Sequence, residues 1–489
     1  MKSSGNRRND LVYRIDKAVG DGLERVIRAH HRRRLGRIGW SGAFDPSGGI
    51  WCTGDPPPRE GNSIDVLIDG AEAFPAIVEA LRAACSSVYF AGWHVTPDFV
   101  VSSSGSEVVA AKKLFQELGE EVDVRILLWA GAPLPPPFSP SRRGVRSICD
   151  ELGRGRRTLV AVDSKERPLH CRHEKIIVID GELAFVGGID MTNLAGDRMD
   201  SNRHPARGAI GWHDATTRLR GPIVADVARH FEMRWGEVTG EWVPPTQEPA
   251  VAGNVEVQIV RTVPEKIYAS MPRGDFRILE AYVRALRAAR HFIYLENQFL
   301  WSSEIVKILA DKLHDPPSED FRLLMLLPAK PSTGMDDTLG QLAVLEAADG
   351  GAGRMLACTL YASDGAQAQP VYIHAKIGVV DDHWLTIGSA NLNNHSLFND
   401  SEMNVITRDG GLARATRLRL WAEHLERSEE DVAGNPTDLF EELWRPIAQT
   451  QLELRETGAP LTHRLVQLPH VSKRAKRLLG PLQTMIVDG

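Results

Sequence analysis

Apolar runs alternate with amphipathic segments along most of the chain. Residues 76–84 and 277–290 place apolar side chains at helical spacing, and each segment leads into a short run rich in β-branched and aromatic residues. A second helical segment, another strand and two strands joined by an acidic turn follow in both cases. Strands that alternate with helices in this way predict layered α/β domains.

The second half of the chain repeats the first. ALRAACSSVYFAGWHV at 80–95 matches ALRAARHFIYLENQFL 205 positions later, and DVRILLW at 123–129 matches DFRLLML 197 positions later. Segments that keep one order and nearly one spacing indicate a duplicated domain, since solenoid repeats are far shorter. The Pro- and Gly-rich stretch at 242–254 is the predicted seam. We therefore expect a basic extension, two similar halves and a basic tail, at residues 1–58, 59–243, 254–450 and 451–489.

One charged motif occurs in both halves. RHEKIIVIDGELAFVGG at 172–188 and IHAKIGVVDDHWLTIGS at 373–389 share the pattern His-x-Lys, four residues, Asp, six residues, Gly. Because residues i and i+2 of a strand share a face, His173 and Lys175 are predicted to emerge together, as are His374 and Lys376. Two such motifs inside a duplicated unit favour a functional site over the alternative of buried structural histidines.

An imidazole beside an ammonium suits the chemistry of phosphate esters. Lysine offsets the charge that builds on the non-bridging oxygens, and histidine acts as a nucleophile or as a general acid and base near neutral pH. Two halves that face each other would put both pairs around one phosphorus atom. This chemistry requires no metal, and the sequence lacks the carboxylate clusters of a two-metal phosphodiesterase. We therefore expect neither a metal nor another cofactor.

Four carboxylates accompany the motifs. Asp180 and Asp381 close the two motifs seven residues after the histidines, and we interpret them as structural groups in turns. A nucleophilic histidine needs an acceptor at its other ring nitrogen. The best-placed candidates are Asp214 in GWHD and Glu402 in DSEMN, 41 and 28 residues after the histidines of their own halves. The alternative for each is an ordinary surface acid.

Charge is unevenly distributed along the chain. Residues 1–38 carry eleven Lys and Arg against four acids, so a formal net charge of −6 leaves −13 on the remainder. Apolar residues recur at helical spacing in this segment, which predicts either a helix on an anionic membrane surface or a solvated basic helix. The basic stretch at 470–479 has the same two interpretations. An acidic remainder disfavours nucleic acid as a partner.

Cysteine usage and hydropathy indicate a cytoplasmic protein. The five cysteines are scattered and show no metal-ligand spacing, so we expect reduced thiols and no structural zinc. No apolar run approaches the roughly 20 residues of a membrane-spanning helix. MKSSGNRRND at the N-terminus lacks the apolar stretch of a secretory signal.

These residues resemble the phospholipase D superfamily, whose signature is a pair of HKD motifs. The second copy keeps the family's extended form with Gly388, Ser389 and Asn391. The first ends in Gly-Gly-Ile-Asp190, similar to the variant of the larger, eukaryote-type phospholipases D. YLENQFL from 294 and WHD from 212 are also similar to that branch, and the resemblance covers roughly residues 60–430.

The resemblance implies a bilobal fold of two α/β/α sandwich halves, with the motifs meeting at a pseudo-twofold axis, and a covalent phosphohistidine intermediate. His173 would be the nucleophile, and His374 the general acid that later activates water or an alcohol. Asp214 and Glu402 would orient the histidines. The implied phosphate-binding residues are Lys175, Lys376, Ser389 and Asn391. Two departures stand out: Asp190 replaces an amide, and no calcium- or phosphoinositide-binding module is recognisable before the core.

The expected activity is therefore hydrolysis of the distal phosphodiester of glycerophospholipids, such as phosphatidylcholine to phosphatidic acid, together with transfer of the phosphatidyl group to alcohols. A cardiolipin synthase-like phosphatidyltransferase, a nuclease of the superfamily and a non-catalytic lipid-binding module are the alternatives. We expect a monomer that associates peripherally with membranes and takes a phospholipid substrate and a water or alcohol acceptor.

Overall fold

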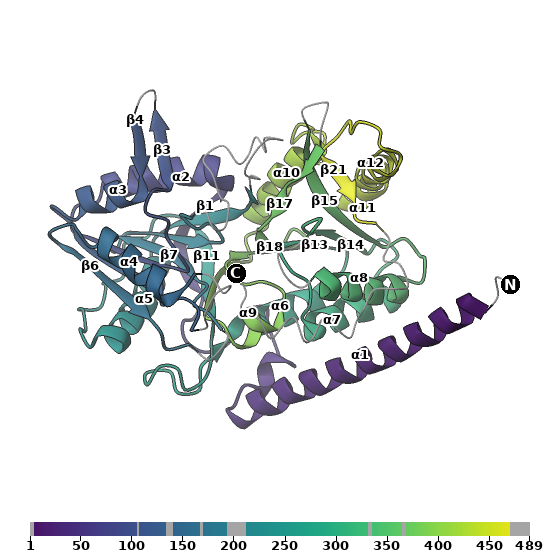
Figure 1. Cartoon of the computed structure of the whole chain (residues 1–489), viewed down its shortest axis with the longest axis horizontal. Coiled ribbons are helices and arrows are strands. Elements are labelled where there is room, and N and C mark those ends of the chain that lie inside the picture. Colours follow the sequence, from purple (N-terminus) through teal and green to yellow (C-terminus); the bar gives the residue numbers. More distant parts are fainter. Residues whose placement is uncertain are drawn as a thin grey trace.

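The computed structural model describes residues 4–104, 107–133, 140–166, 170–192, 212–330, 335–363 and 368–469. Two α/β halves lie side by side, and a long N-terminal helix runs along the second of them (Figure 1). The basic stretch at 470–479 falls outside the described residues.

The first half is built on a mixed seven-stranded sheet. Its spatial order is β1-β10-β8-β7-β2-β5-β6, with parallel pairs β2–β5 and β5–β6 and the other pairs antiparallel. The strands are β1 (Arg59–Ile68), β2 (Ser87–Gly92), β5 (Asp123–Trp129), β6 (Thr158–Asp163), β7 (Lys175–Ile179), β8 (Leu183–Gly187) and β10 (Ala215–Arg220). The ribbon β3–β4 (Val100–Ser104, Glu107–Ala110) pairs apart from this sheet.

The second half repeats this order. β11-β20-β19-β18-β13-β14-β15 has the same sequence of parallel and antiparallel pairs, and β21 is added at its edge. The strands are β11 (Val255–Val263), β13 (Phe292–Asn297), β14 (Arg322–Leu326), β15 (Met355–Ser363), β18 (Lys376–Val380), β19 (Trp384–Gly388), β20 (Glu402–Thr407) and β21 (Leu465–Gln467). Three short strands, β12 (Asp275–Phe276), β16 (Ala368–Pro370) and β17 (Tyr372–Ile373), complete this half. One topology occurring twice agrees with a duplicated domain.

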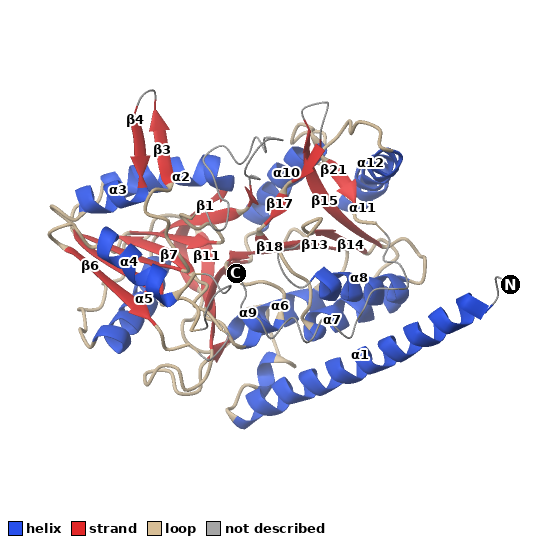
Figure 2. Ribbon diagram, viewed as in Figure 1, coloured by secondary structure: helices blue, strands red, loops and turns tan. Residues whose placement is uncertain are grey.

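Helices cover both sheets (Figure 2). Apolar faces of α2, α3 and α4 pack on the first sheet, and α6, α7 and α8 pack on one side of the second. The bounds are α2 (Asp69–Arg82), α3 (Ala111–Leu118), α4 (Arg142–Leu152), α5 (Ile223–Thr239), α6 (Arg277–Ala288), α7 (Ser303–His314), α8 (Met335–Asp349), α9 (Asn394–Phe398), α10 (Gly410–Leu425), α11 (Pro436–Leu439) and α12 (Arg445–Thr457). No helix among the described residues combines the length and apolar content that crossing a bilayer requires.

The two halves share one apolar core. A single buried cluster contains Tyr89 and Val178 of the first sheet, Phe231 of α5, Leu324 of the second sheet and Trp421 of α10. The edge strands β1 and β11 also pair with each other, antiparallel. The predicted seam at 242–254 is the segment without helix or strand that connects α5 to β11. The observed architecture is thus the bilobal α/β/α arrangement expected from the sequence.

The basic N-terminal segment forms helix α1 (Ser4–Arg37). Its C-terminal turns dock on the second half, where Arg32 bonds Glu304 at 2.9 Å and Arg34 bonds Glu265 at 2.8 Å. Nearer the N-terminus of the helix, the side chains of Val19 and Val26 remain 45% and 61% exposed. The N-terminal end points away from the body (Figure 1). Part of the basic charge of this segment therefore serves docking, while the side chains of Val19 and Val26 stay accessible.

Candidate active site

The two motif histidines lie where the halves meet. His173 and His374 come just before β7 and β18, whereas the sequence pattern placed both inside strands. The backbone N–H groups of His173 and of the next residue donate to the Ser401 carbonyl at 2.9 and 3.1 Å. Those of His374 and of the next residue donate to the His213 carbonyl at 2.8 and 2.9 Å. These bonds to the opposite half replace the expected strand pairing at the histidines.

Each histidine contacts a carboxylate of the opposite half. His173 Nδ1 lies 3.1 and 3.2 Å from the two Glu402 oxygens, and His374 Nδ1 lies 2.5 Å from Asp214 Oδ2. The ring centroids of the two histidines are 6.5 Å apart, and all four side chains are buried. The sequence pattern predicted that each carboxylate would accompany the histidine of its own half. In the structure the partners are exchanged between the halves.

The second half gathers three further polar side chains beside His374. Lys376 Nζ donates to Gln298 Oε1 at 3.3 Å, and Asn391 Nδ2 donates to the same oxygen at 3.2 Å. Lys376 also donates to the carbonyl of His374. Gln298 was not singled out by sequence reasoning, although it lies within YLENQFL. A neutral amide therefore accompanies the lysine of this motif.

The first half differs at the equivalent place. Lys175 Nζ lies 3.1 Å from Asp190 Oδ2 and donates to the His173 carbonyl at 2.6 Å. Burial raises the pKa of Asp190, with Lys175 opposing the shift. The site thus contains one lysine paired with Asp190 and one lysine bonded to the amide of Gln298.

The tails of the motifs fit the two carboxylates. A Cβ on Gly188 would come within 2.2 Å of Asp214 Oδ1, so Asp214 requires glycine there. The corresponding position of the second motif is Ser389, whose hydroxyl donates to Glu402. Ser396 donates to the other Glu402 oxygen at 2.6 Å. The two motif tails therefore differ because each contacts a different acid: Gly188 leaves space for Asp214, and Ser389 donates a hydrogen bond to Glu402.

Burial dominates the electrostatics of the site. It raises the pKa of Glu402 to about 8, against the opposing effects of Lys175 and the two serine hydroxyls. It also raises the pKa of Asp214. Burial, followed by the charges of Lys376, Lys175 and His173, lowers the pKa of His374 well below its usual value.

Asp180 and Asp381 close the hairpins β7–β8 and β18–β19. Both adopt positive φ, 54° and 51°, which Asp tolerates in turns. Asp180 accepts backbone N–H bonds of 2.8, 2.7 and 2.9 Å from Cys85, Ser86 and Ser87. Burial alone would raise the pKa of Asp180, but these bonds lower it.

Asp381 repeats the contacts in the second half. It accepts bonds of 2.7, 2.8 and 2.7 Å from the backbone N–H groups of Arg290, His291 and Phe292. Each acid thus ties its hairpin to the start of β2 or β13. This geometry supports the structural interpretation of both motif aspartates.

Asp180→Ala is expected to lower the free energy of unfolding by about 2 kcal/mol, because three backbone donors lose a charged acceptor. Asp180→Asn should cost less, since its amide oxygen still accepts. Thermal unfolding measures both variants, with exposed Glu182→Ala of the same turn as control. Turnover at a permissive temperature should stay within about tenfold, since the length of β7, on the order of 16 Å, separates Asp180 from Lys175. An unchanged melting temperature in Asp180→Ala would contradict the assigned role.

Aromatic rings flank His374. The centroid of the half-buried Trp212 ring lies 4.0 Å from that of His374 and 4.9 Å from that of Tyr372. Tyr372 OH in turn accepts a bond of 3.0 Å from Gln298. Residue Trp212 belongs to β9 (Trp212–His213), which pairs in parallel with β17 and so brings segments of both halves together.

A buried network lies behind Asp214. His213 bonds Glu296 at 2.8 Å and Asp69 at 3.0 Å, and His424 bonds Glu296 at 2.9 Å. All four groups are fully buried. We interpret the network as a structural support for β9, because its bonds join His213 of this strand to both halves.

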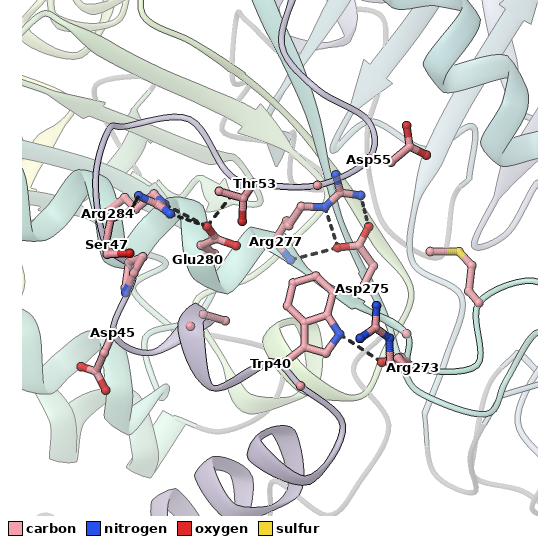
Figure 3. Close-up of a pocket in the computed structure, with 17 residues that line it drawn as sticks. Trp40, Asp45, Ser47, Thr53, Asp55, Arg273, Asp275, Arg277, Glu280 and Arg284 are labelled. Carbon is pink, nitrogen blue, oxygen red and sulfur yellow. Dashed lines mark hydrogen bonds and ion pairs between the residues drawn. The ribbon is translucent and has the colours of Figure 1, made fainter.

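A separate cavity of about 420 Å³ lies between the N-terminal segment and α6 (Figure 3). Trp40, Arg273 and Asp55 line it, and its arginines 277 and 284 bond Asp275 and Glu280. None of the sequence-predicted site residues is among the described residues that line it. Its charges largely pair with one another, so it does not compete with the histidine site as the reaction centre.

Comparison with known proteins finds similarity to phospholipases D. Residues 282–423 match a family model described as cardiolipin synthase, PLD-like domain. Phospholipase D A of Dictyostelium discoideum is 24% identical over 76% of this chain, phospholipase D alpha 4 of Arabidopsis thaliana 24% over 74%, and phospholipase D2 of Bos taurus 22% over 82%. The chain spans 36%, 64% and 57% of the lengths of these relatives.

A solved structure shares the fold. Phosphatidylserine synthase of Haemophilus influenzae Rd KW20 superimposes with a TM-score of 0.50 and 12% sequence identity, covering 73% of this chain and 84% of that one. At this identity the likeness concerns the fold.

Proposed function

We propose that this chain, which belongs to the phospholipase D superfamily, cleaves the distal phosphodiester of glycerophospholipids and transfers the phosphatidyl group to water or to an alcohol. The observation that carries the proposal is the crossed pair of histidine–carboxylate contacts, with two lysines beside two imidazoles 6.5 Å apart. Several relatives are phospholipases D by name, which supports a phospholipid substrate.

The first chemical step uses both histidines. His173 Nε2 attacks phosphorus while the bond from phosphorus to the headgroup oxygen breaks. His374, which is protonated once the anionic phosphate offsets the lysines, gives that oxygen the proton of its Nε2. Glu402 accepts the Nδ1–H of His173 and stabilises its positive charge as the phosphohistidine forms. Lys175 and Lys376, with Asn391, compensate the charge on the non-bridging oxygens.

The second step reverses these roles. A water or alcohol oxygen attacks phosphorus, His374 takes its proton, and the bond from phosphorus to His173 Nε2 breaks. Asp214 stabilises His374 when this imidazole becomes protonated. The anionic phosphate also offsets the surrounding lysines, which otherwise disfavour a protonated His374. One chain completes one site, so we propose a monomer.

The assay mixes purified protein with phosphatidylcholine vesicles and butan-1-ol. We expect phosphatidic acid and phosphatidylbutanol, and neither product from the His173→Ala/His374→Ala double variant. Absence of both products with the unsubstituted protein would reject phosphatidylcholine as substrate. A cardiolipin synthase-like activity is the second candidate, favoured by the description of the matching family model; it predicts cardiolipin from phosphatidylglycerol alone.

Asp190→Asn is expected to strengthen binding of a phosphate mimic such as orthovanadate about tenfold. The substitution removes the negative charge that pairs with Lys175 at 3.1 Å, and a unit charge near a bound anion costs about 1–2 kcal/mol at an effective dielectric of 20. Asn391→Asp is the reciprocal control and should weaken binding similarly. Isothermal titration measures both, and equal affinity in the two variants would contradict the assignment.

We propose further that α1 carries the protein to anionic membranes. Arg25 and Arg33 are exposed on the described part of this helix, close to exposed Val26. Co-sedimentation with phosphatidylserine vesicles should decrease several-fold in Arg25→Glu/Arg33→Glu and at 0.5 M salt. Binding that is insensitive to both changes would reject this role for α1.

A further inference from the structure

A cluster of potential metal ligands lies between the halves. His170 belongs to the first half, whereas His395 of α9 and Asp400 belong to the second. His170 Nδ1 lies 3.1 Å from His395 Nδ1 and 3.4 Å from Asp400 Oδ1. The three ligand atoms lie within 4.8 Å of one another. Two imidazole nitrogens and one carboxylate oxygen therefore point at a common place.

These spacings fit a tetrahedral metal site. Metal–ligand bonds of about 2.0–2.1 Å place tetrahedral ligands about 3.3 Å apart. The measured separations of 3.1 and 3.4 Å bracket this value. Imidazole and carboxylate ligands together suit zinc and its neighbours better than calcium or magnesium, which prefer oxygen.

Hydrogen bonding within the cluster leaves one group unsatisfied. Asp400 is fully buried, and its Oδ1 accepts the Cys171 N–H at 2.9 Å. Its Oδ2 accepts no hydrogen bond from any described residue. A buried carboxylate oxygen without a partner is costly, and a cation beside it would remove that cost.

The cluster is accessible from one side. The His170 side chain is 17% exposed, whereas Asp400 and His395 are buried. This exposure provides an entry path for an ion. The buried network of His213, Glu296 and His424 differs, because all of its groups are enclosed.

We propose that His170, His395 and Asp400 bind one divalent transition-metal ion of the zinc class and that this ion ties the two halves together. The sequence-based expectation of no structural zinc rested on cysteine spacing. It did not consider ligands from distant segments: His170 and His395 are 225 residues apart.

The location gives the site a structural consequence for the reaction centre. His170 lies three residues before His173, and Asp400 lies two residues before Glu402. Ser396, which donates to Glu402 at 2.6 Å, directly follows His395. A bound ion therefore fixes the segments that hold the His173–Glu402 pair.

The test is Zn²⁺ binding to the chelator-treated full-length protein. Isothermal titration should give one site with a micromolar or lower Kd and a rise in melting temperature. His170→Ala and His395→Ala should each weaken binding at least tenfold, and Asp400→Asn should weaken it while keeping the shape of the side chain. Cobalt substitution should give the visible absorption of a tetrahedral site. Circular dichroism checks that each variant is folded.

Two controls separate this site from other histidines. The exposed His291→Ala should bind Zn²⁺ normally, and so should His374→Asn, which alters the reaction centre. The proposal is overturned if the unsubstituted protein binds no Zn²⁺ at equimolar concentration. It is equally overturned if folded His170→Ala and His395→Ala bind as well as the unsubstituted protein does.

Discussion

His173→Ala is expected to lower the rate of phosphodiester turnover by a factor of about 10⁴ or more. The covalent phosphoprotein should no longer form. The reason is the loss of the nitrogen that forms the bond to phosphorus, for which the site offers no replacement in the same orientation. Rapid quenching with a phospholipid labelled at phosphorus measures the trapped intermediate. His383→Ala, which replaces an exposed histidine in the β18–β19 turn, is the matched control.

His374→Ala should separate the two roles. With a natural headgroup the first step slows by about 10²–10⁴, because the departing alkoxide receives no proton. With a phosphatidyl-p-nitrophenol substrate the leaving group needs no proton, so a burst of p-nitrophenol should persist and phosphoprotein should accumulate. Phosphoprotein in His173→Ala and none in His374→Ala would exchange the two assignments.

Much of the fold was predictable from local pattern. The offset repeats predicted two similar halves, and the observed strand orders are the same in both. Ile- and Val-rich runs on either side of an acidic turn predicted hairpins, because such residues fit a buried strand and Asp fits the left-handed turn. The hairpin signal is local, whereas at His173 and His374 bonds to the opposite half replace the strand pairing that the pattern predicts.

The partners of the histidines were not predictable in this way. Asp214 and Glu402 were identified by residue type, yet each serves the histidine of the opposite half. This exchange follows from the backbone bonds that dock each motif on the other half, which no spacing along one segment encodes. The pairing of Lys175 with Asp190 likewise depends on side chains that converge only after folding.

Glu402→Gln is expected to reduce kcat about 10²–10⁴-fold with little change in KM. The carboxylate holds His173 Nδ1 at 3.1 Å, fixes its tautomer and stabilises the positive charge that forms on the ring; a neutral amide does neither well. Asp214→Asn should act likewise on His374. Thermal unfolding should remain close to that of the unsubstituted protein, since each replacement keeps the size of the side chain. A loss confined to KM would show that Glu402 serves substrate binding instead.

The pH dependence gives a second measure of the same role. Burial raises the pKa of Glu402 to about 8, so its ionised form increases as pH rises through that value. With phosphatidyl-p-nitrophenol, whose leaving group needs no proton from His374, the rate of the burst should therefore rise between pH 7 and 9. Glu402→Gln should lose this rise. Ser389→Ala removes a hydroxyl that favours the ionised acid, so the rise should move to higher pH. A shift to lower pH in Ser389→Ala would mean that the titrating group is not Glu402, because loss of a donor cannot stabilise its carboxylate.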